Sequence, residues 1–364
     1  MKKIKIFDLK DQYKKIAKEV NKNIIDILSS GQYILGRNVR DLEDKFAKHV
    51  GSKYAISCNS GTDALLLSLR AMNIGKGDEV ITTPFTYFAT AEVIALTGAK
   101  PIFADINPHT FNINHKLVEK LINRKTKAII PVHLFGQSCE ITKIKNLCKK
   151  YKISLIEDCA QSFGAKKNNK YTGTFGDFGC YSFFPTKNLG CAGDGGMIVT
   201  NSLQRSKILQ KLRNHGGIIR NIHEYIGYNS RLDEIQASIL ITKLKIIDNI
   251  NEKRIKIANK YKTLINNKNI SVPYQMADNY HVYNQFTLKV KNRKKFISYL
   301  EDHNIPFGVY YPIPAYKQKA FKKYNYKYNL KNVEKITKEC ISIPIYPELD
   351  NDSIEYIAKI INKF

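Results

Sequence analysis

A lysine in an apolar, glycine-bounded segment is the strongest candidate for covalent chemistry. Lys187 lies in the run Ser182-Phe-Phe-Pro-Thr-Lys-Asn-Leu-Gly190. Desolvation lowers the pKa of a lysine amine, and a neutral amine can attack an aldehyde to form a Schiff base. The alternative is a loop lysine whose charged end reaches solvent. The segment therefore predicts a nucleophilic amine, with the surface lysine as the competing interpretation.

An aspartate directly follows an apolar strand expected at 153–157. A carboxylate such as Asp158 at that position can pair with the protonated ring nitrogen of a cofactor. It could instead cap a helix or bind a metal ion. His133 favours a metal slightly, but no third ligand has suitable spacing, so we predict no metal site.

Two glycine-containing turns suit a phosphate-bearing ligand. Ser60-Gly61-Thr62 joins a strand to a helix, where backbone N–H groups and the helix dipole attract anions. The same residues could be an ordinary helix cap. Ser182 could reach the phosphate held at Thr62. Gly193-Asp-Gly-Gly196 permits close backbone approach to a ligand, and neither turn matches a Walker loop or a GxGxxG fingerprint.

The elements that position these residues alternate between strands and helices. This rhythm predicts a mainly parallel sheet between helices, with ligands beyond the carboxyl ends of the strands. Helices are expected first at 12–28 and 38–49. The expected strands are 54–57, 79–83, 101–104, 127–132, 153–157, 180–184 and 196–200, and the intervening helices 86–96, 115–123 and 140–151.

The last third of the chain has a different pattern. A long helical periodicity covers 231–265, followed by strands expected at 283–290 and 307–311 and a helix at 294–303. We therefore predict an α/β protein with a large domain over residues 1–245 and a smaller α+β domain over residues 246–364.

Composition narrows the class of protein. The formal net charge of +27 could serve nucleic acid, a membrane surface or an anionic substrate, but the lysines are spread along the chain, so we expect a solvated basic surface and no nucleic-acid partner. No apolar run is long enough to span a bilayer, and residues 1–7 lack the features of a signal peptide. The seven cysteines include no CxxC pair. We expect a cytoplasmic protein without disulfides or membrane contact.

Several motifs, in order along nearly the whole chain, resemble the DegT-type sugar aminotransferases, which are pyridoxal phosphate (PLP) enzymes of the aspartate-aminotransferase fold. They are Ser60-Gly-Thr-Asp-Ala-Leu65, Gly77-Asp-Glu-Val80, Pro131-Val-His-Leu-Phe-Gly-Gln137, Glu157-Asp-Cys-Ala-Gln161, Ser182–Gly190, Gly193–Gly196 and Gly227-Tyr-Asn-Ser-Arg-Leu-Asp-Glu-Ile-Gln-Ala237. The resemblance implies a large domain with a seven-stranded type of sheet.

The resemblance also implies a role for each matching residue. Lys187 would form the Schiff base and move the proton, and Asp158 would bind the pyridine nitrogen. The other implied residues are Gly61, Thr62, the Asp63 backbone and Ser182 at the phosphate, Gln161 near the PLP 3-hydroxyl, Tyr87 stacked on the ring, Asn229 reaching the PLP of the second subunit of a homodimer, and Tyr33 and Tyr311 at the substrate.

The implied reaction moves an amino group from L-glutamate, through pyridoxamine phosphate, to a nucleotide-linked keto sugar. The segment 131–137 looks more like the group that aminates C3 of a dTDP-linked 3-keto-6-deoxyhexose than the C4 group. Family members that are dehydratases have His at the position of Lys187, which argues against that reaction. Amination at C4 and a non-catalytic PLP-binding regulator are the alternatives. Asn284, Tyr311 and Tyr316 stand where histidines are common, which affects sugar specificity.

Overall fold

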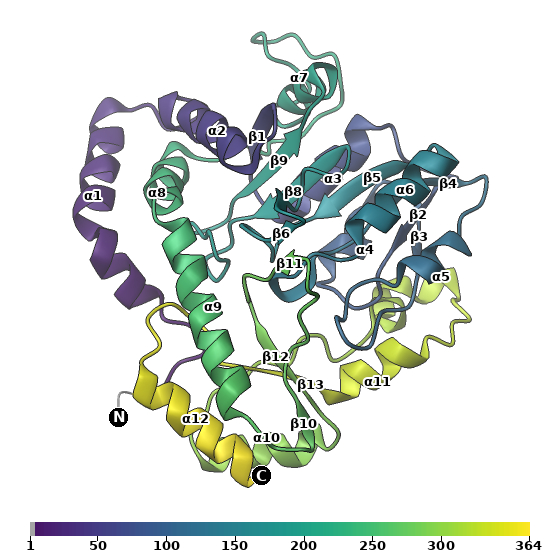
Figure 1. Ribbon diagram of the computed structural model, residues 1–364. Coiled ribbons are helices and arrows are strands. Elements are labelled where there is room, and N and C mark those ends of the chain that lie inside the picture. The colour runs from purple at the N-terminus through teal and green to yellow at the C-terminus, as the bar shows by residue number, and fades with distance from the viewer. Residues whose placement is uncertain (1–3) are drawn as a thin grey trace.

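The computed structural model describes residues 4–364, and its centre is a seven-stranded, mainly parallel sheet (Figure 1). Four neighbouring pairs are parallel, and β8–β9 and β9–β1 are antiparallel. This arrangement confirms the predicted sheet. In spatial order the strands are β1 (Tyr54–Cys58), β9 (Gly196–Thr200), β8 (Phe178–Ser182), β5 (Ser154–Asp158), β4 (Thr126–Ile130), β2 (Glu79–Thr82) and β3 (Lys100–Phe103).

Helices cover both faces of this sheet. In β4, Ala128 and Ile130 pack into one apolar cluster with residues of α3 (Gly61–Ala71), α4 (Ala89–Leu96) and α7 (Leu203–Leu212). The intervening Ile129 packs into another cluster, with α5 (His115–Glu119) and α6 (Ile141–Tyr151). Successive side chains of a strand point to opposite faces, so a stretch buried on both sides must be apolar, as residues 128–130 of β4 are.

The two N-terminal helices pack against the helix that precedes the C-terminal region, and the second of them also packs beside β1. They are α1 (Leu9–Ser30) and α2 (Arg37–Val50), and both contact α8 (Glu234–Leu244). Asp8 caps α1 by accepting hydrogen bonds from the backbone N–H groups of Lys10 and Asp11, and Gly31 ends the helix in a left-handed conformation.

The helical pattern over 231–265 is divided into two helices, α8 and α9 (Ile247–Leu264), which corrects the expectation of one long helix. The second of these helices, α9, spans two cores. Ile247 and Ile250 join the cluster around α2 and α8, whereas Ile257 and Tyr261 join the C-terminal core.

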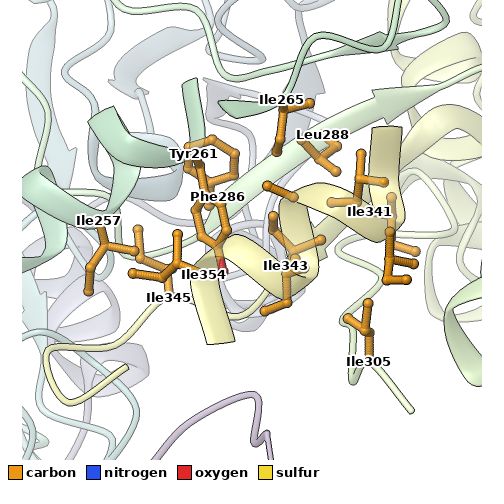
Figure 2. Packing of buried hydrophobic residues seen from close by; sticks show 14 of the residues in the cluster. Ile257, Tyr261, Ile265, Phe286, Leu288, Ile305, Ile341, Ile343, Ile345 and Ile354 are labelled. Carbon is orange, nitrogen blue, oxygen red and sulfur yellow. The ribbon is translucent and has the colours of Figure 1, made fainter. Parts of the chain in front are cut away.

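The C-terminal core lies on a three-stranded sheet at the far end of the molecule from α7 (Figure 1). Tyr261 of α9 packs against Phe286, with ring centroids 5.1 Å apart, and Ile343 and Leu288 surround them (Figure 2). The core contains residues of β10 (Ile270–Ser271), β12 (Phe286–Val290), β13 (Cys340–Ile343), α10 (Arg293–Asp302) and α12 (Asn351–Lys363). The helix α11 (Lys331–Glu339) packs instead in a cluster with Phe103 of β3. A separate small sheet contains β11 (Asn279–Tyr280), β6 (Lys166–Lys167) and β7 (Lys170–Tyr171).

The prediction of a strand at 307–311 was wrong. Only Gly308 pairs there, in an isolated bridge with Ser342, and the third strand of the sheet is β13. Prolines at 306 and 312 flank the segment, and proline cannot donate to a strand ladder.

The segment that follows residue 310 is fastened to the main sheet instead. Ala315 N–H donates to the Pro84 carbonyl at 2.8 Å. The Asp105 carboxylate accepts from the backbone N–H groups of Asn332 and Val333, both at 3.0 Å, and so caps α11 from a distant part of the chain. These contacts hold Tyr311 beside the carboxyl ends of the strands. None of the helices among residues 4–364 is long and apolar enough to cross a membrane.

Candidate active site

A cavity of about 580 Å³ opens at the carboxyl ends of the parallel strands. Asp158 ends β5 and Ser182 ends β8, while the turn at Gly61 follows β1. Ligand sites of open α/β sheets lie at this edge. Of the residues predicted from sequence, the lining includes Gly61, Thr62, Tyr87, Asp158, Gln161, Ser182, Lys187 and Tyr311.

The turn before α3 is closely packed against the end of β8. Ser60 caps the helix by accepting a 3.0 Å hydrogen bond from Asp63 N–H. A Cβ on Gly61 would lie 2.6 Å from the Ser182 Cβ, so only glycine allows this approach. The N-terminal N–H groups of α3 and the hydroxyls of Thr62 and Ser182 thus share one corner of the cavity, which is suited to a phosphate.

A buried carboxylate faces the same cavity. Asp158 is 4% exposed, and its Oδ2 accepts a 2.8 Å hydrogen bond from the Thr90 hydroxyl while Oδ1 accepts one of 3.1 Å from Ala160 N–H. Burial raises the pKa of Asp158, and the two hydrogen bonds and Lys187 oppose that shift. A carboxylate in this setting would gain most from a cationic partner, such as a protonated pyridine nitrogen.

Lys187 has the properties expected of a Schiff-base lysine. Its side chain lines the cavity, and its backbone N–H donates to the Phe184 carbonyl at 2.9 Å. Burial lowers the pKa of the amine to about 8, although the nearby Asp158 carboxylate acts in the opposite direction. About a tenth of the amine is therefore neutral at pH 7, far more than for an ordinary lysine. This supports the nucleophile over the solvent-reaching lysine.

Amide side chains fix the backbone next to this lysine. Asn188 Nδ2 donates to Asn251 Oδ1 at 2.7 Å and to the Val282 carbonyl at 3.1 Å, while its Oδ1 accepts from Asn284 Nδ2 at 2.9 Å. All three asparagines are buried. Asn284, which the family resemblance connects with sugar specificity, therefore also supports the Lys187 loop.

Gln161 joins the cavity floor to the C-terminal region. Its Oε1 accepts from Phe135 N–H at 2.7 Å, and its Nε2 donates to the Tyr311 hydroxyl at 2.8 Å. Burial raises the pKa of Tyr311, so the phenol stays protonated. The exposed Tyr87 ring lies 6.5 Å from that of Tyr311, on the rim of the cavity.

Three predicted residues do not line the cavity. Asp63 lies in the first turn of α3 with its carboxylate bonded to Ser230, at 2.6 Å. Asn229 and Tyr33 are exposed, and neither is among the described residues of the cavity wall. Within one chain, the structure therefore does not bring them to Lys187.

Sequence reasoning missed Thr90 and Asn188. Thr90 lies one helical turn after Thr86, and the two hydroxyls are 2.9 Å apart. Thr86 precedes α4, so the turn that leads into this helix brings the two hydroxyls together. In the helix expected at 86–96, the i, i+4 spacing of the two threonines was a signal that could have been used. Asn188 is adjacent to Lys187, but its three amide contacts come from parts of the chain that only the fold brings together.

One buried cluster of His133, Glu157 and Cys159 has a composition that could hold a metal ion. The donors are already used. Glu157 accepts from the N–H groups of Gly173, Phe175 and Gly176 as well as contacting His133 Nε2 at 2.9 Å. His133 Nδ1 accepts from Cys139 N–H at 3.2 Å. We therefore interpret the cluster as a structural hydrogen-bond network.

The cavity residues fit pyridoxal phosphate. The corner at Gly61 and Ser182 suits its phosphate, the buried Asp158 carboxylate suits its pyridinium nitrogen, and the Lys187 amine suits its aldehyde. All three groups line the same cavity, so a single ligand can contact all of them.

Two similar proteins are named as sugar aminotransferases, and a third is named as a regulatory protein. The chain is 43% identical over 355 residues to the UDP-2-acetamido-2-deoxy-3-oxo-D-glucuronate aminotransferase of Pseudomonas aeruginosa, covering 98% of both chains. It is 41% identical over 361 residues to the dTDP-3-amino-3,6-dideoxy-alpha-D-galactopyranose transaminase of Aneurinibacillus thermoaerophilus, covering 99% of both. It is also 41% identical over 365 residues to a protein of Geobacillus stearothermophilus named as a pleiotropic regulatory protein, covering 99% of this chain and 98% of that one.

Solved structures agree with the fold and the cofactor. Streptomyces venezuelae DesV in complex with a ketimine intermediate superposes with a TM-score of 0.97 at 32% identity, over 100% of this chain and 98% of that one. NtdA of Bacillus subtilis with bound cofactor PMP superposes at 0.89 and 28% identity, over 95% and 81% of the two chains.

A family model covers almost the whole chain, from residue 14 to residue 362. Together with the cavity and the relatives, this match identifies the cofactor as pyridoxal phosphate and the reaction class as transamination. The chain belongs to the DegT/DnrJ/EryC1/StrS aminotransferase family.

Proposed function

We propose that this enzyme transfers an amino group from L-glutamate to C3 of a nucleotide-linked keto sugar, with a dTDP-linked 3-keto-6-deoxyhexose as the leading substrate. The observation that carries the proposal is the Lys187 amine and the buried Asp158 carboxylate on one cavity beside a phosphate-type turn. The names of both sugar-transaminase relatives describe chemistry at position 3 of the sugar, which supports C3 over C4.

Each cavity residue then has a task. Pyridoxal phosphate supplies an aldehyde that accepts amines and a protonated ring that stores the electrons of a broken C–H bond. Lys187 holds the cofactor between turnovers, then accepts a proton from the donor carbon and returns one to the sugar carbon. Asp158 keeps the ring nitrogen protonated, Tyr87 covers the ring, and Gln161 lies at the 3-hydroxyl. Gly61, Thr62, the Asp63 backbone and Ser182 bind the phosphate.

Asn229 would complete the phosphate site of a second copy of the chain in a homodimer. It lies in a surface loop, and the loop exposes large apolar side chains at positions 218, 219, 222 and 226, of which Ile226 is 97% exposed. Such a group of apolar side chains is typical of an association surface. Tyr311, on the cavity wall, and Tyr33, outside it in one chain, are proposed to contact the sugar nucleotide.

We also propose that residues 246–364 form the small domain and that the enzyme is cytoplasmic. The C-terminal core is built mainly from residues of α9 and later elements, which supports a boundary near 246. All seven cysteines are buried and unpaired, in keeping with a reducing compartment.

Amination of defined sugars tests the substrate. Purified enzyme would be incubated with L-glutamate and, separately, with 3-keto and 4-keto dTDP sugars, with UDP-linked 3-keto sugars in parallel. Amine formed only from 3-keto substrates, absent in Lys187→Ala and present in the distant control Lys170→Ala, supports the proposal. Amine formed only from the 4-keto sugar would overturn the position.

A PLP-binding regulator is the second candidate, and the name of the Geobacillus relative is the observation that favours it. It would bind pyridoxal phosphate but show no release of 2-oxoglutarate with any keto sugar. The charge of +27 raises nucleic-acid binding as a third class; salt-dependent binding of duplex DNA at physiological ionic strength, by a protein that captures no PLP, would favour it.

A further inference from the structure

The surface loop over residues 214–229, here called the arm, is fastened at both ends to the unit that forms the phosphate turn. The arm leaves α7 and returns before α8, and it projects from the body beside α7 (Figure 1). Its two ends meet in an isolated bridge between Asn214 and Asn229. Backbone hydrogen bonds tie this base to the end of α7, from Tyr228 N–H to the Leu212 carbonyl at 2.7 Å and from Gly216 N–H to the Lys211 carbonyl at 2.8 Å. Side-chain contacts run from the base to β1 and α3.

Two of the anchors flank the bridge. At the entry, the buried Arg213 donates to the Ser57 carbonyl of β1 at 2.8 Å and pairs with the Glu43 carboxylate. At the exit, the Tyr228 hydroxyl accepts a 3.0 Å hydrogen bond from Arg70 Nε of α3. The arm is therefore positioned by the strand and the helix on either side of Ser60-Gly61-Thr62.

Ser230 makes the most direct link. It is fully buried, and its hydroxyl donates to Asp63 Oδ2 at 2.6 Å while accepting from Asn59 N–H at 3.3 Å. Its backbone N–H donates to the Arg213 carbonyl at 2.9 Å. One hydroxyl thus contacts both sides of the phosphate turn, and the residue directly before Ser230 is the arm residue Asn229.

The negative charge of Asp63 explains why its hydrogen bond with Ser230 matters for phosphate binding. Asp63 lies in the first turn of α3, where a bound phosphate and the carboxylate would repel each other. The carboxylate does not line the cavity, and the hydrogen bond from Ser230 satisfies it on the side away from the ligand. Hydrogen bonds to a charged group are among the stronger ones in proteins, so the orientation of Asp63 and the position of residues 229–230 depend on each other.

We propose that Ser230 is a positioning residue that couples occupancy of the cofactor-phosphate turn to ordering of the arm. This inference rests on the proposed function, since it takes the ligand of the turn to be the phosphate of pyridoxal phosphate. Filling the turn in one chain fixes Asp63, Ser230 and hence Asn229, the residue that the second chain uses. Cofactor binding in one active site thereby prepares the other.

Amide hydrogen exchange of residues 214–229 tests the coupling. Apoenzyme would be compared with enzyme containing pyridoxal phosphate and with enzyme containing pyridoxal, which has the aldehyde but no phosphate. In the wild type we expect pyridoxal phosphate to slow exchange in the arm and pyridoxal to leave it unchanged. Ser230→Ala should lose this protection and bind pyridoxal phosphate roughly tenfold more weakly. Arm protection in Ser230→Ala equal to that of the wild type would overturn the proposal.

Matched variants keep the result interpretable. Ser238→Ala removes another buried hydroxyl, which donates to the Ile235 carbonyl of its own helix at 2.8 Å; this variant should behave as the wild type. If Ser230→Ala does not fold, Asp63→Asn weakens the same bond without changing its shape, and unchanged arm protection in it would equally overturn the coupling. Failure to aminate any sugar, with phosphate-dependent arm protection that requires Ser230, would reject the proposed substrate and leave the coupling supported.

Discussion

The Thr90 hydroxyl lies 2.8 Å from Asp158 Oδ2 and is the only side-chain donor to this carboxylate among residues 4–364. Thr90 also contacts the Thr86 hydroxyl at 2.9 Å, so a short chain of hydroxyls leads from the start of α4 to the base of the cavity. Because the hydrogen bond lowers the pKa of Asp158 while burial raises it, Thr90 helps to keep the carboxylate charged.

Replacing this threonine should weaken catalysis without removing the cofactor. Thr90→Val retains the shape and loses the donor, so the pKa of Asp158 should rise further and its pairing with the ring nitrogen should weaken. We expect kcat/KM to fall roughly tenfold, the effect of about 1.4 kcal/mol, with the acid limb of the pH–rate profile moved to higher pH. Thr97→Val is the control, because the Thr97 hydroxyl donates to the Ile94 carbonyl at 2.7 Å and accepts from Ala99 N–H at 3.4 Å, and neither partner lines the cavity. An unmoved acid limb would contradict the assigned role.

Capture of cofactor by the apoenzyme should follow the pKa of Lys187. The neutral amine is the reactive form, and burial lowers its pKa to about 8, so the rate should rise with pH and reach half its maximum near pH 8. Stopped-flow absorbance with pyridoxal phosphate measures it. In Asp158→Asn the midpoint should move to lower pH, because the carboxylate that raises the pKa of Lys187 is gone. A midpoint near 10.5, the ordinary lysine value, would show that the amine is solvated.

The amide contacts of Asn188 should matter for the placement of Lys187. Asn284→Ala removes the donor to Asn188 Oδ1 and leaves a buried acceptor unpaired, which costs about 1–3 kcal/mol. We expect slower cofactor capture and a lower kcat with little change in KM for glutamate. Asn279→Ala, which removes a buried amide bonded to the Ser138 carbonyl, is a control of similar structural cost. Equal losses of kcat in both variants would mean that the effect is only structural.

The sequence could predict the strand-end residues because their positions depend on local order. Asp158 and Ser182 end apolar strands that alternate with helices, and parallel strands bring their carboxyl ends to one edge. The lysine could be recognised from its apolar, glycine-bounded segment. These features need no knowledge of contacts distant in the chain.

Contacts between segments far apart in the chain could not be predicted from sequence patterns. The Asn188–Asn251–Asn284 amides and the cap that Asp105 provides for α11 join residues far apart in sequence, and no period or spacing reports them. The break at Ile246 was missed because α8 and α9 both carry buried apolar residues that fit one helical pattern.

Glycine at position 61 should be required for cofactor binding. An added methyl group would lie 2.6 Å from the Ser182 Cβ and 3.1 Å from the Ser182 Cα, so either α3 or the end of β8 must shift. We expect Gly61→Ala to weaken binding of pyridoxal phosphate by at least tenfold, since small displacements disturb several phosphate contacts together. Gly75→Ala, whose Cβ would meet only the Thr97 carbonyl at 3.4 Å, should bind normally. Titration of both apoenzymes with cofactor makes the comparison.

The buried imidazole of His281 should make the enzyme sensitive to acid. Its ring stacks on Tyr283 with centroids 3.8 Å apart, and Nδ1 accepts a 3.0 Å hydrogen bond from Tyr283 N–H. Burial first, and then the charge of Lys262, lower the pKa of His281 to about 3. The ring therefore stays neutral in the folded protein at pH values where an unfolded chain would bind a proton.

The sign of the effect follows from this difference. Above pH 6.5 neither state protonates the ring, and as pH falls from about 6.5 toward 3 only the unfolded state gains the proton, so stability is lost at about 1.4 kcal/mol per pH unit. His281→Asn keeps an acceptor near Tyr283 N–H and does not titrate. Urea unfolding of both holoenzymes would be measured at equal concentration at pH 7, 5.5 and 4.5. As pH falls, the free energy of unfolding should decrease more steeply in the wild type than in the variant, by about 1.4 kcal/mol per pH unit. Parallel pH dependences would mean that His281 is protonated in the folded protein.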